Sequence, residues 1–264
     1  NDLLKLVDKL NVTDAHFIPI SALNGDNVVD SSDKMKWYQG KTFLNLIETI
    51  EIKKDKNSKI ARFPVQTIIR PDSAEYHDYR GYAGRVAGGT FLTGDEIIVL
   101  PSMLKSKISG IDDAGKKLSE ASTGDSVCLT LQDPIDISRG DMIVKPGELP
   151  HSAQDINLMV CWFNERQLKT GIKYLVRTNA NETTCIIKSV NYKININNLE
   201  KNSTDKDIRM NDISNISIRT SKPLYFDTYV KNNTTGSLIF IEEGTNETIG
   251  AGMIMSEDKV SISV

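Results

Sequence analysis

The densest group of chemically reactive side chains lies in residues 75–82, which carry a histidine, two carboxylates, an arginine and three tyrosines. An arginine such as Arg80 can hold an anion through two parallel hydrogen bonds, and the imidazole of His77 can titrate. One interpretation is a loop at the mouth of a β-barrel that contacts a partner or ligand through His77, Arg80 and Tyr82. The other, which we favour, is a long hairpin whose tyrosines cover the barrel end while its charges stay solvated.

The remaining reactive groups form no catalytic or metal-binding pattern. The histidines His16, His77 and His151 are far apart in the sequence, and the cysteines form no Cys-x-x-Cys pair. We therefore expect no metal site. The sequence also lacks a Gly-x-x-x-x-Gly-Lys-Ser/Thr phosphate loop and a Gly-x-Ser-x-Gly elbow, so we assign no catalytic residue.

Two tryptophans have different sequence contexts. Trp37 and Tyr38 lie in a polar stretch, where they form either a binding platform or, as we favour, a packing anchor. Trp162 lies on an alternating apolar run, which predicts a core position.

Composition limits the classes of function. The 264 residues include 32 Lys and Arg against 35 Asp and Glu, for a net charge of −3, which disfavours a general nucleic-acid binder. The three cysteines lie apart within apolar runs, which favours buried thiols in a reducing compartment and a cytoplasmic protein. No apolar run approaches the roughly 20 residues that span a bilayer. The first residue is Asn1, not methionine, so we interpret the chain as a fragment.

The first 55 residues differ from the rest. Apolar spacing predicts helices near residues 3–10 and 42–50 and a short strand at 17–20. A single strand has no sheet to join, so we interpret residues 1–55 as the remnant of a larger α/β domain that ends in a charged linker.

From Arg62 onward the apolar pattern has period two, typical of strands. Three Gly-Asp pairs, at Gly94, Gly124 and Gly140, each lead into a β-rich run, with the glycine suited to positive φ and the aspartate to bonding the turn backbone. Short strands between such turns predict a small β-barrel at residues 56–149.

A second alternating series predicts another barrel at residues 150–264. One conflict arises where Ile186, Val190 and Tyr192 share a predicted face with Lys188, which a β-bulge or a position at the barrel rim would explain. Residues 199–211 are polar and read as a helical or irregular surface connection. The predicted fold class is thus mainly β, with two consecutive antiparallel barrels after an α/β remnant.

Three motifs in order resemble the translation-factor GTPase superfamily, whose best-known member is elongation factor Tu. Ser21, Ala22 and Leu23 resemble the last guanine-recognition turn, in which backbone amides meet the guanine oxygen. Residues 136–147 resemble the end of the second domain, and residues 235–237 with 248–254 the end of the third.

Within this superfamily, the chain is most similar to the large, GTP-binding subunit family of bacterial sulfate adenylyltransferase (ATP sulfurylase). The residues that carry the resemblance are 35–44, 62–66, 79–84, 194–199 and 236–241. The resemblance implies a heterodimeric nucleotidyltransferase of sulfate assimilation. In this family, GTP hydrolysis is coupled to adenylyl transfer from ATP to sulfate on a small catalytic subunit, giving adenosine 5′-phosphosulfate and pyrophosphate.

The resemblance also implies what this chain lacks. The phosphate loop, the switch regions and the magnesium-binding aspartate should precede Ser21, so GTP and Mg²⁺ are cofactors of the full-length family and none is expected for the fragment. Its implied partners are the small subunit and its own missing GTPase domain. Alternatives are a two-barrel module that binds tRNA or the ribosome, and a fragment without independent activity.

Overall fold

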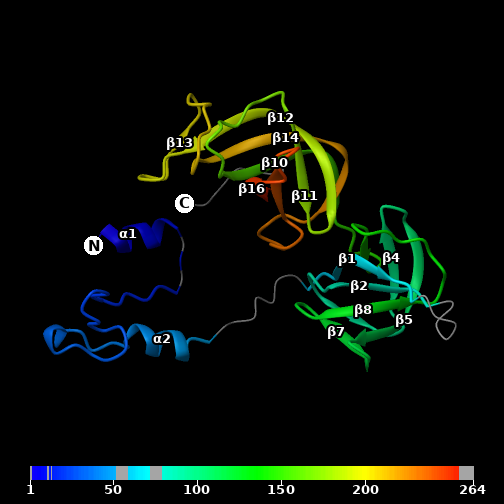
Figure 1. The fold of residues 1–264 in the computed structure, drawn as a ribbon, viewed down its shortest axis with the longest axis horizontal. Coiled ribbons are helices and arrows are strands. Elements are labelled where there is room, and N and C mark those ends of the chain that lie inside the picture. The colour runs from blue at the N-terminus through cyan, green and yellow to red at the C-terminus, as the bar shows by residue number, and fades with distance from the viewer. Residues whose placement is uncertain (1, 11, 13, 52–58, 72–78, 256–264) are drawn as a thin grey trace. The chain divides into compact units, whose positions relative to one another are not determined.

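The computed structural model describes residues 2–10, 12, 14–51, 59–71 and 79–255. The chain divides into two units, whose main segments are Asn1–Asp55 and Lys56–Val260. In Figure 1 the first unit is blue, and the second runs from cyan to red.

The first unit contains little regular structure. Its helices are α1 (Asp2–Lys9), the 3₁₀-helix η1 (Asp33–Met35) and α2 (Phe43–Thr49). The hydroxyl of Thr42 accepts the amide of Asn45 and caps α2. Both predicted helices are confirmed. The strand predicted at residues 17–20 is wrong: these described residues form no strand, because the only pairing nearby is a single bridge between Ser21 and Asp26.

The first unit also has no hydrophobic core among its described residues. Only Asn27 and Thr42 are buried there, and both are polar. Twelve large apolar side chains are exposed instead: Leu4, Leu10, Val12, Phe17, Ile20, Leu23, Val29, Trp37, Phe43, Leu44, Ile47 and Ile50. Burial of apolar surface is the main favourable term in folding, so this unit gains little stability by itself.

The second unit begins with a closed barrel. Its sheet has the order β4-β9-β1-β2-β8-β5-β6, and the pairing of β4 with β5 closes it. A small β3–β7 sheet accompanies it. The strands are β1 (Arg62–Ile69), β2 (Gly81–Arg85), β3 (Thr90–Leu92), β4 (Glu96–Leu100), β5 (Leu104–Asp113), β6 (Lys116–Leu118), β7 (Glu120–Ser122), β8 (Ser126–Leu131) and β9 (Met142–Val144).

A second closed barrel follows in the same unit. Its order is β11-β15-β16-β10-β14-β12-β13, and β11 pairs with β12 to close it. The strands are β10 (His151–Trp162), β11 (Lys173–Thr178), β12 (Asn181–Ile194), β13 (Lys201–Asn202), β14 (Ile213–Phe226), β15 (Ser237–Ile241) and β16 (Thr248–Ile254). The predicted mainly β fold with two consecutive antiparallel barrels is confirmed, and closure leaves few free strand edges.

Each barrel has its own apolar core. Phe63, Phe91 and Ile143 are fully buried in the first core. In the second, Trp162 contacts Phe240 edge to face at 6.2 Å between ring centroids. The predicted core position of Trp162 is confirmed.

All three Gly-Asp turns form as predicted. Gly94, Gly124 and Gly140 have φ values of 94°, 98° and 96°. Asp95, Asp125 and Asp141 each accept the amide of the residue three positions earlier, at 2.7 to 2.8 Å. Asp212 makes the same bond to Arg209 after Asn211, so the second barrel has an equivalent turn without glycine.

The conflict in β12 is resolved by bulges. The register against β14 shifts between Ile187 and Ser189 and again between Val190 and Tyr192. Val190 and Tyr192 are buried as expected, but Ile186 is exposed on the same side as Lys188, and Ile187 is buried instead. The bulge interpretation was right, and the placement of Ile186 was wrong. Residues 199–211 form an irregular connection that contains β13.

A buried polar cluster joins the two barrels. Nε and Nη2 of Arg62 donate to the two carboxylate oxygens of Asp227 at 2.8 and 2.9 Å. Thr235 donates to Asp227 at 2.7 Å, and Asn232 donates to the carbonyl of Ala87 at 3.0 Å. Arg62 and Asp227 are 1% and 5% exposed. Because solvent does not reach the pair, water could not take over the hydrogen bonds of one side chain if the other were removed.

Candidate functional site

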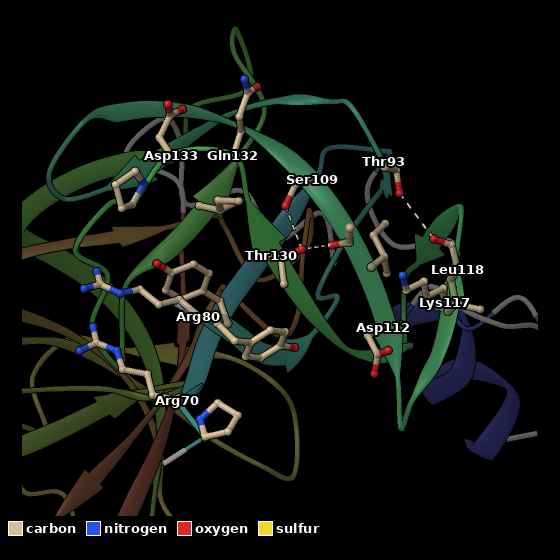
Figure 2. Close-up of a pocket in the computed structure, with 17 residues that line it drawn as sticks. Arg70, Arg80, Thr93, Ser109, Asp112, Lys117, Leu118, Thr130, Gln132 and Asp133 are labelled. Carbon is tan, nitrogen blue, oxygen red and sulfur yellow. Dashed lines mark hydrogen bonds between the residues drawn. The ribbon is translucent and has the colours of Figure 1, made fainter. Parts of the chain in front are cut away.

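A cavity of about 1000 Å³ lies on the first barrel (Figure 2). Strands β1, β2, β5, β6 and β8 and their connections form its walls. We call it the first-barrel groove. Its lining residues are Arg70, Pro71, Tyr79, Arg80, Tyr82, Thr93, Ser109, Gly110, Ile111, Asp112, Lys117, Leu118, Thr130, Leu131, Gln132, Asp133 and Pro134.

Two arginines lie together at one end of this groove. Ile69 pairs with Gly81 where β1 and β2 end, so Arg70 and Arg80 occupy adjoining positions just beyond the pair. Figure 2 shows both guanidinium groups extending in the same direction. Among the described residues, the carboxylate contact of this pair is a long one, 3.9 Å from Arg70 to the exposed Asp136. The arginine pair therefore keeps hydrogen-bonding capacity for an anion.

Strands β5 and β8, beside the arginine pair, carry internally bonded polar groups. Ser109 donates to the hydroxyl of Thr130 at 2.9 Å, and Thr130 donates to the carbonyl of Gly110 at 3.3 Å. Asp133 accepts the hydroxyl of Ser106 at 2.7 Å. These bonds fix the orientation of the polar groups on this wall of the groove.

Tyr79 and Tyr82 pack against neighbouring groups of the protein and do not extend into solvent. Tyr82 is 1% exposed, and its hydroxyl donates to the carbonyl of Ile135 at 2.8 Å. The hydroxyl of Tyr79 lies 3.6 Å from the Cys128 sulfur, and burial, with this contact, raises the pKa of Tyr79 to about 12. Burial also raises the pKa of the Cys128 thiol. Both groups are thus neutral at physiological pH.

Of the three residues predicted for this loop, Arg80 is the one whose charged group lines the groove. Tyr82 lies at its base with the ring in the core. His77 lies outside the described residues.

The turn formed by Ser21, Ala22 and Leu23 lies in the first unit. The amide of Ser21 donates to the carbonyl of Asp26 at 3.1 Å, and Ala22 and Leu23 are exposed at the tip, Leu23 by 96%. The tip of the turn is therefore on the surface of the first unit.

Asn27 organises this turn and was missed by sequence reasoning. It is 2% exposed with φ +55°, donates to the carbonyl of Pro19 at 3.0 Å and accepts the amide of Ser32 at 2.8 Å. Its carbonyl also accepts the amide of Phe43 at the start of α2. The sequence offered one clue, because an asparagine in a polar loop is among the few residues that adopt positive φ.

No group of three or more metal-ligating side chains occurs in the described part of the chain. Nor does any described helix have the length and apolarity to cross a membrane.

Comparison with known proteins places the chain in a family context. The family model described as GTP-eEF1A C-terminal domain-like matches residues 155–255, nearly the whole second barrel. The chain is 40% identical to sulfate adenylyltransferase subunit 1 of Colwellia psychrerythraea over 95% of its own length. The chain is thus similar to sulfate adenylyltransferase subunit 1 along nearly its whole length.

Other relatives agree. The bifunctional enzyme CysN/CysC of Rhodopirellula baltica is 40% identical over 97% of the chain, and the subunit 1 of Psychromonas ingrahamii is 40% identical over 96%. The chain spans 39% of the first of these proteins and 53% of the second, so it spans about half the length of its curated relatives or less. The predicted resemblance is confirmed.

The fold is shared more widely. A structure of sup35 complexed with GDP superposes with a TM-score of 0.68 at 17% identity, covering 96% of this chain and 64% of that one. At this identity the likeness shows the fold alone.

Proposed function

We propose that this chain is the C-terminal part of the GTPase subunit of a sulfate adenylyltransferase. That enzyme couples GTP hydrolysis to the formation of adenosine 5′-phosphosulfate and pyrophosphate from ATP and sulfate. The observation that carries the proposal is 40% identity to sulfate adenylyltransferase subunit 1 along 95% of the chain. The wholly β-barrel second unit, without a nucleotide-binding motif, supports a role in contacts between domains and subunits.

The proposal divides the chain into three parts. Residues 1–55 are the end of a GTPase domain and its linker, and residues 56–149 and 150–264 are the two barrels. The exposed apolar side chains of residues 1–55 support this division, because they need the rest of an α/β domain to cover them. GTP and Mg²⁺ then belong to the whole subunit, and the chain alone binds neither.

We propose Ser21, Ala22 and Leu23 as the part of the guanine site that this chain retains. We propose the loop of His77 and Arg80 as a contact for the small subunit or a ligand, whereas the buried Tyr82 anchors this loop to the barrel core. The paired guanidinium groups of Arg70 and Arg80 support an acidic or otherwise anionic contact there.

A chimera tests the proposed function. The chain would replace the matching half of the Colwellia psychrerythraea subunit, and GTP-dependent phosphosulfate formation would be measured with that organism's small subunit. We expect GTP to raise the rate as in the parent. A chimera that folds, binds GTP and pairs with the small subunit but gives no GTP-dependent rate would overturn the proposal.

A proline variant tests the guanine turn within the chimera. Ala22→Pro removes a backbone N–H, so we expect GTP affinity to fall about tenfold or more, the cost of roughly one hydrogen bond to a polar ligand. Val29→Ala, at another exposed loop position, is the matched control and should bind GTP normally. Equal affinity of the Ala22→Pro chimera and its control would remove this turn from the site.

A further inference from the structure

A second cavity, of about 360 Å³, lies between the two barrels of the second unit. We call it the interbarrel crevice. Its floor is apolar: the buried Leu100 and Met142 of the first barrel pack against the half-buried Tyr225 of the second. Pro64, Pro101 and Pro223 extend this apolar surface. A cavity of this size suits a metabolite rather than a macromolecule.

Two cationic side chains line the crevice, one from each barrel. Arg139 precedes β9, and Lys222 lies on β14. Within the described residues, neither forms an ion pair with a carboxylate. Asp141 is the only acidic residue among the described residues that line the crevice. It already accepts the amide of Ser138 at 2.8 Å, and burial raises its pKa. The crevice therefore has net positive charge with no internal partner for its two cations.

Neutral polar groups complete the lining on the second-barrel side. Asn179, Asn181 and Thr183 contribute amide and hydroxyl groups at the turn between β11 and β12. This turn touches the Gly140 turn of the first barrel, because a Cβ on Gly140 would lie 3.1 Å from the Cα of Asn181. The contact fixes both turns, so the crevice is formed before any ligand arrives.

We propose that the interbarrel crevice binds a small organic oxyanion. Its phosphate, sulfate or carboxylate group lies between Arg139 and Lys222, and its apolar body lies on the accessible Tyr225, Pro101 and Pro223. The same ligand contacts both barrels, so it stabilises their packed arrangement. This inference does not depend on the proposed enzymatic function, and it concerns a different site from the first-barrel groove.

Three probes of related structure separate the two parts of the site. Phenyl phosphate has both an oxyanion and an apolar body, inorganic phosphate has only the first, and phenol has only the second. Each would be titrated into the full chain while backbone amide chemical shifts are recorded. We expect phenyl phosphate to bind at least about tenfold more tightly than either other probe, because it gains both the ionic and the apolar contribution. The shifted amides should be those of the crevice, including Asn181, Thr183 and Leu224.

Charge-neutralising variants test the two cations. Arg139→Gln and Lys222→Gln should each weaken phenyl phosphate about tenfold, the value of roughly one charge-assisted hydrogen bond. Lys116→Gln removes an equally exposed lysine at the start of β6 and should leave affinity unchanged. Thermal unfolding of each variant without ligand shows that the fold is retained.

Two outcomes would overturn the proposal. The first is equal binding of phenyl phosphate and inorganic phosphate, with shifts spread over all exposed lysines, which is general ion attraction. The second is unchanged phenyl phosphate affinity in the Arg139→Gln and Lys222→Gln variants.

Discussion

The two units of this chain obtain order by different means. In the second unit, two closed barrels surround apolar cores with side chains such as Phe63, Ile143 and Trp162 almost fully removed from water. In the first unit, the buried residues among those described are Asn27 and Thr42, which organise a loop and cap a helix through hydrogen bonds. Hydrogen bonds contribute only about 1 kcal/mol net each, so they shape a segment but do not hold it together without a core.

Because only the second unit has apolar cores among its described residues, large motif side chains are buried only there. In the second unit, the motif residues Arg62 and Thr235 meet at the contact between barrels, where both donate to Asp227. In the first unit, Trp37 is 73% exposed although it belongs to an equally recognisable run. The Trp37 run therefore has no apolar core to pack against among the described residues of the first unit.

The two tryptophans give the sharpest contrast. Trp162→Ala should lower the free energy of unfolding by about 4 to 5 kcal/mol, because it empties a core site and leaves the carbonyl of Arg166 without its donor. Trp37→Ala should change it by about 0.5 kcal/mol or less. Urea unfolding followed by circular dichroism measures both. Similar losses in the two variants would mean that the first unit has a core of its own.

The buried ion pair between barrels should be nearly as important. Asp227→Ala leaves Arg62 buried without its partner, at a cost of about 3 to 4 kcal/mol. Asp155→Ala breaks exposed pairs with Lys188 and Arg219 and should cost about 1 kcal/mol or less. Urea unfolding measures both losses in the free energy of unfolding. Equal losses in Asp227→Ala and Asp155→Ala would show that the stability of the barrels does not depend on this contact.

Two glycines of the same turn type test the barrel contact in a smaller way. Gly124→Ala should cost about 1 to 2 kcal/mol from positive φ alone, since the nearest atom to its new Cβ is 3.9 Å away. Gly140→Ala adds the approach to Asn181 of the second barrel and should cost about 1 kcal/mol more. Calorimetric unfolding of both variants gives the difference, and a difference of zero would indicate that the two turns move apart freely.

The smallest global effect is expected at Asn27. Asn27→Ala should leave the unfolding of the barrels within about 0.5 kcal/mol of the parent, because its hydrogen bonds lie wholly in the first unit. Locally, the amide of Ser32 should lose its protection from hydrogen exchange. Asn24→Ala, at an exposed position of the same loop, should not affect Ser32.

Features formed by residues close together in the sequence could be predicted, whereas contacts between distant residues could not. The Gly-Asp turns were predictable because positive φ and the aspartate bond involve residues within three positions of each other. The Arg62–Asp227 pair was not, because its members are 165 residues apart and only the packing of two barrels brings them together. The false strand at residues 17–20 was apolar enough, but a strand also needs a neighbour that the sequence pattern does not reveal.

The two candidate cavities could not be predicted for the same reason, because they bring together residues that are distant in the sequence. The positions of Arg70 and Arg80 followed only from the β1–β2 register, and the interbarrel crevice from the contact between two turns. The role of Tyr82 was also hidden, since an aromatic residue beside charged neighbours can turn into the core on the inward face of a strand.

Native-state hydrogen exchange of the intact chain tests the central claim most directly. The claim is that the two barrels form a stable body, whereas the first unit depends on a partner surface. We predict that amides of β10, β14 and β1 exchange only through global unfolding, and that amides of α1 and α2 exchange with free energies of about 1 kcal/mol or less. Equal protection of α2 and β14 would contradict the account.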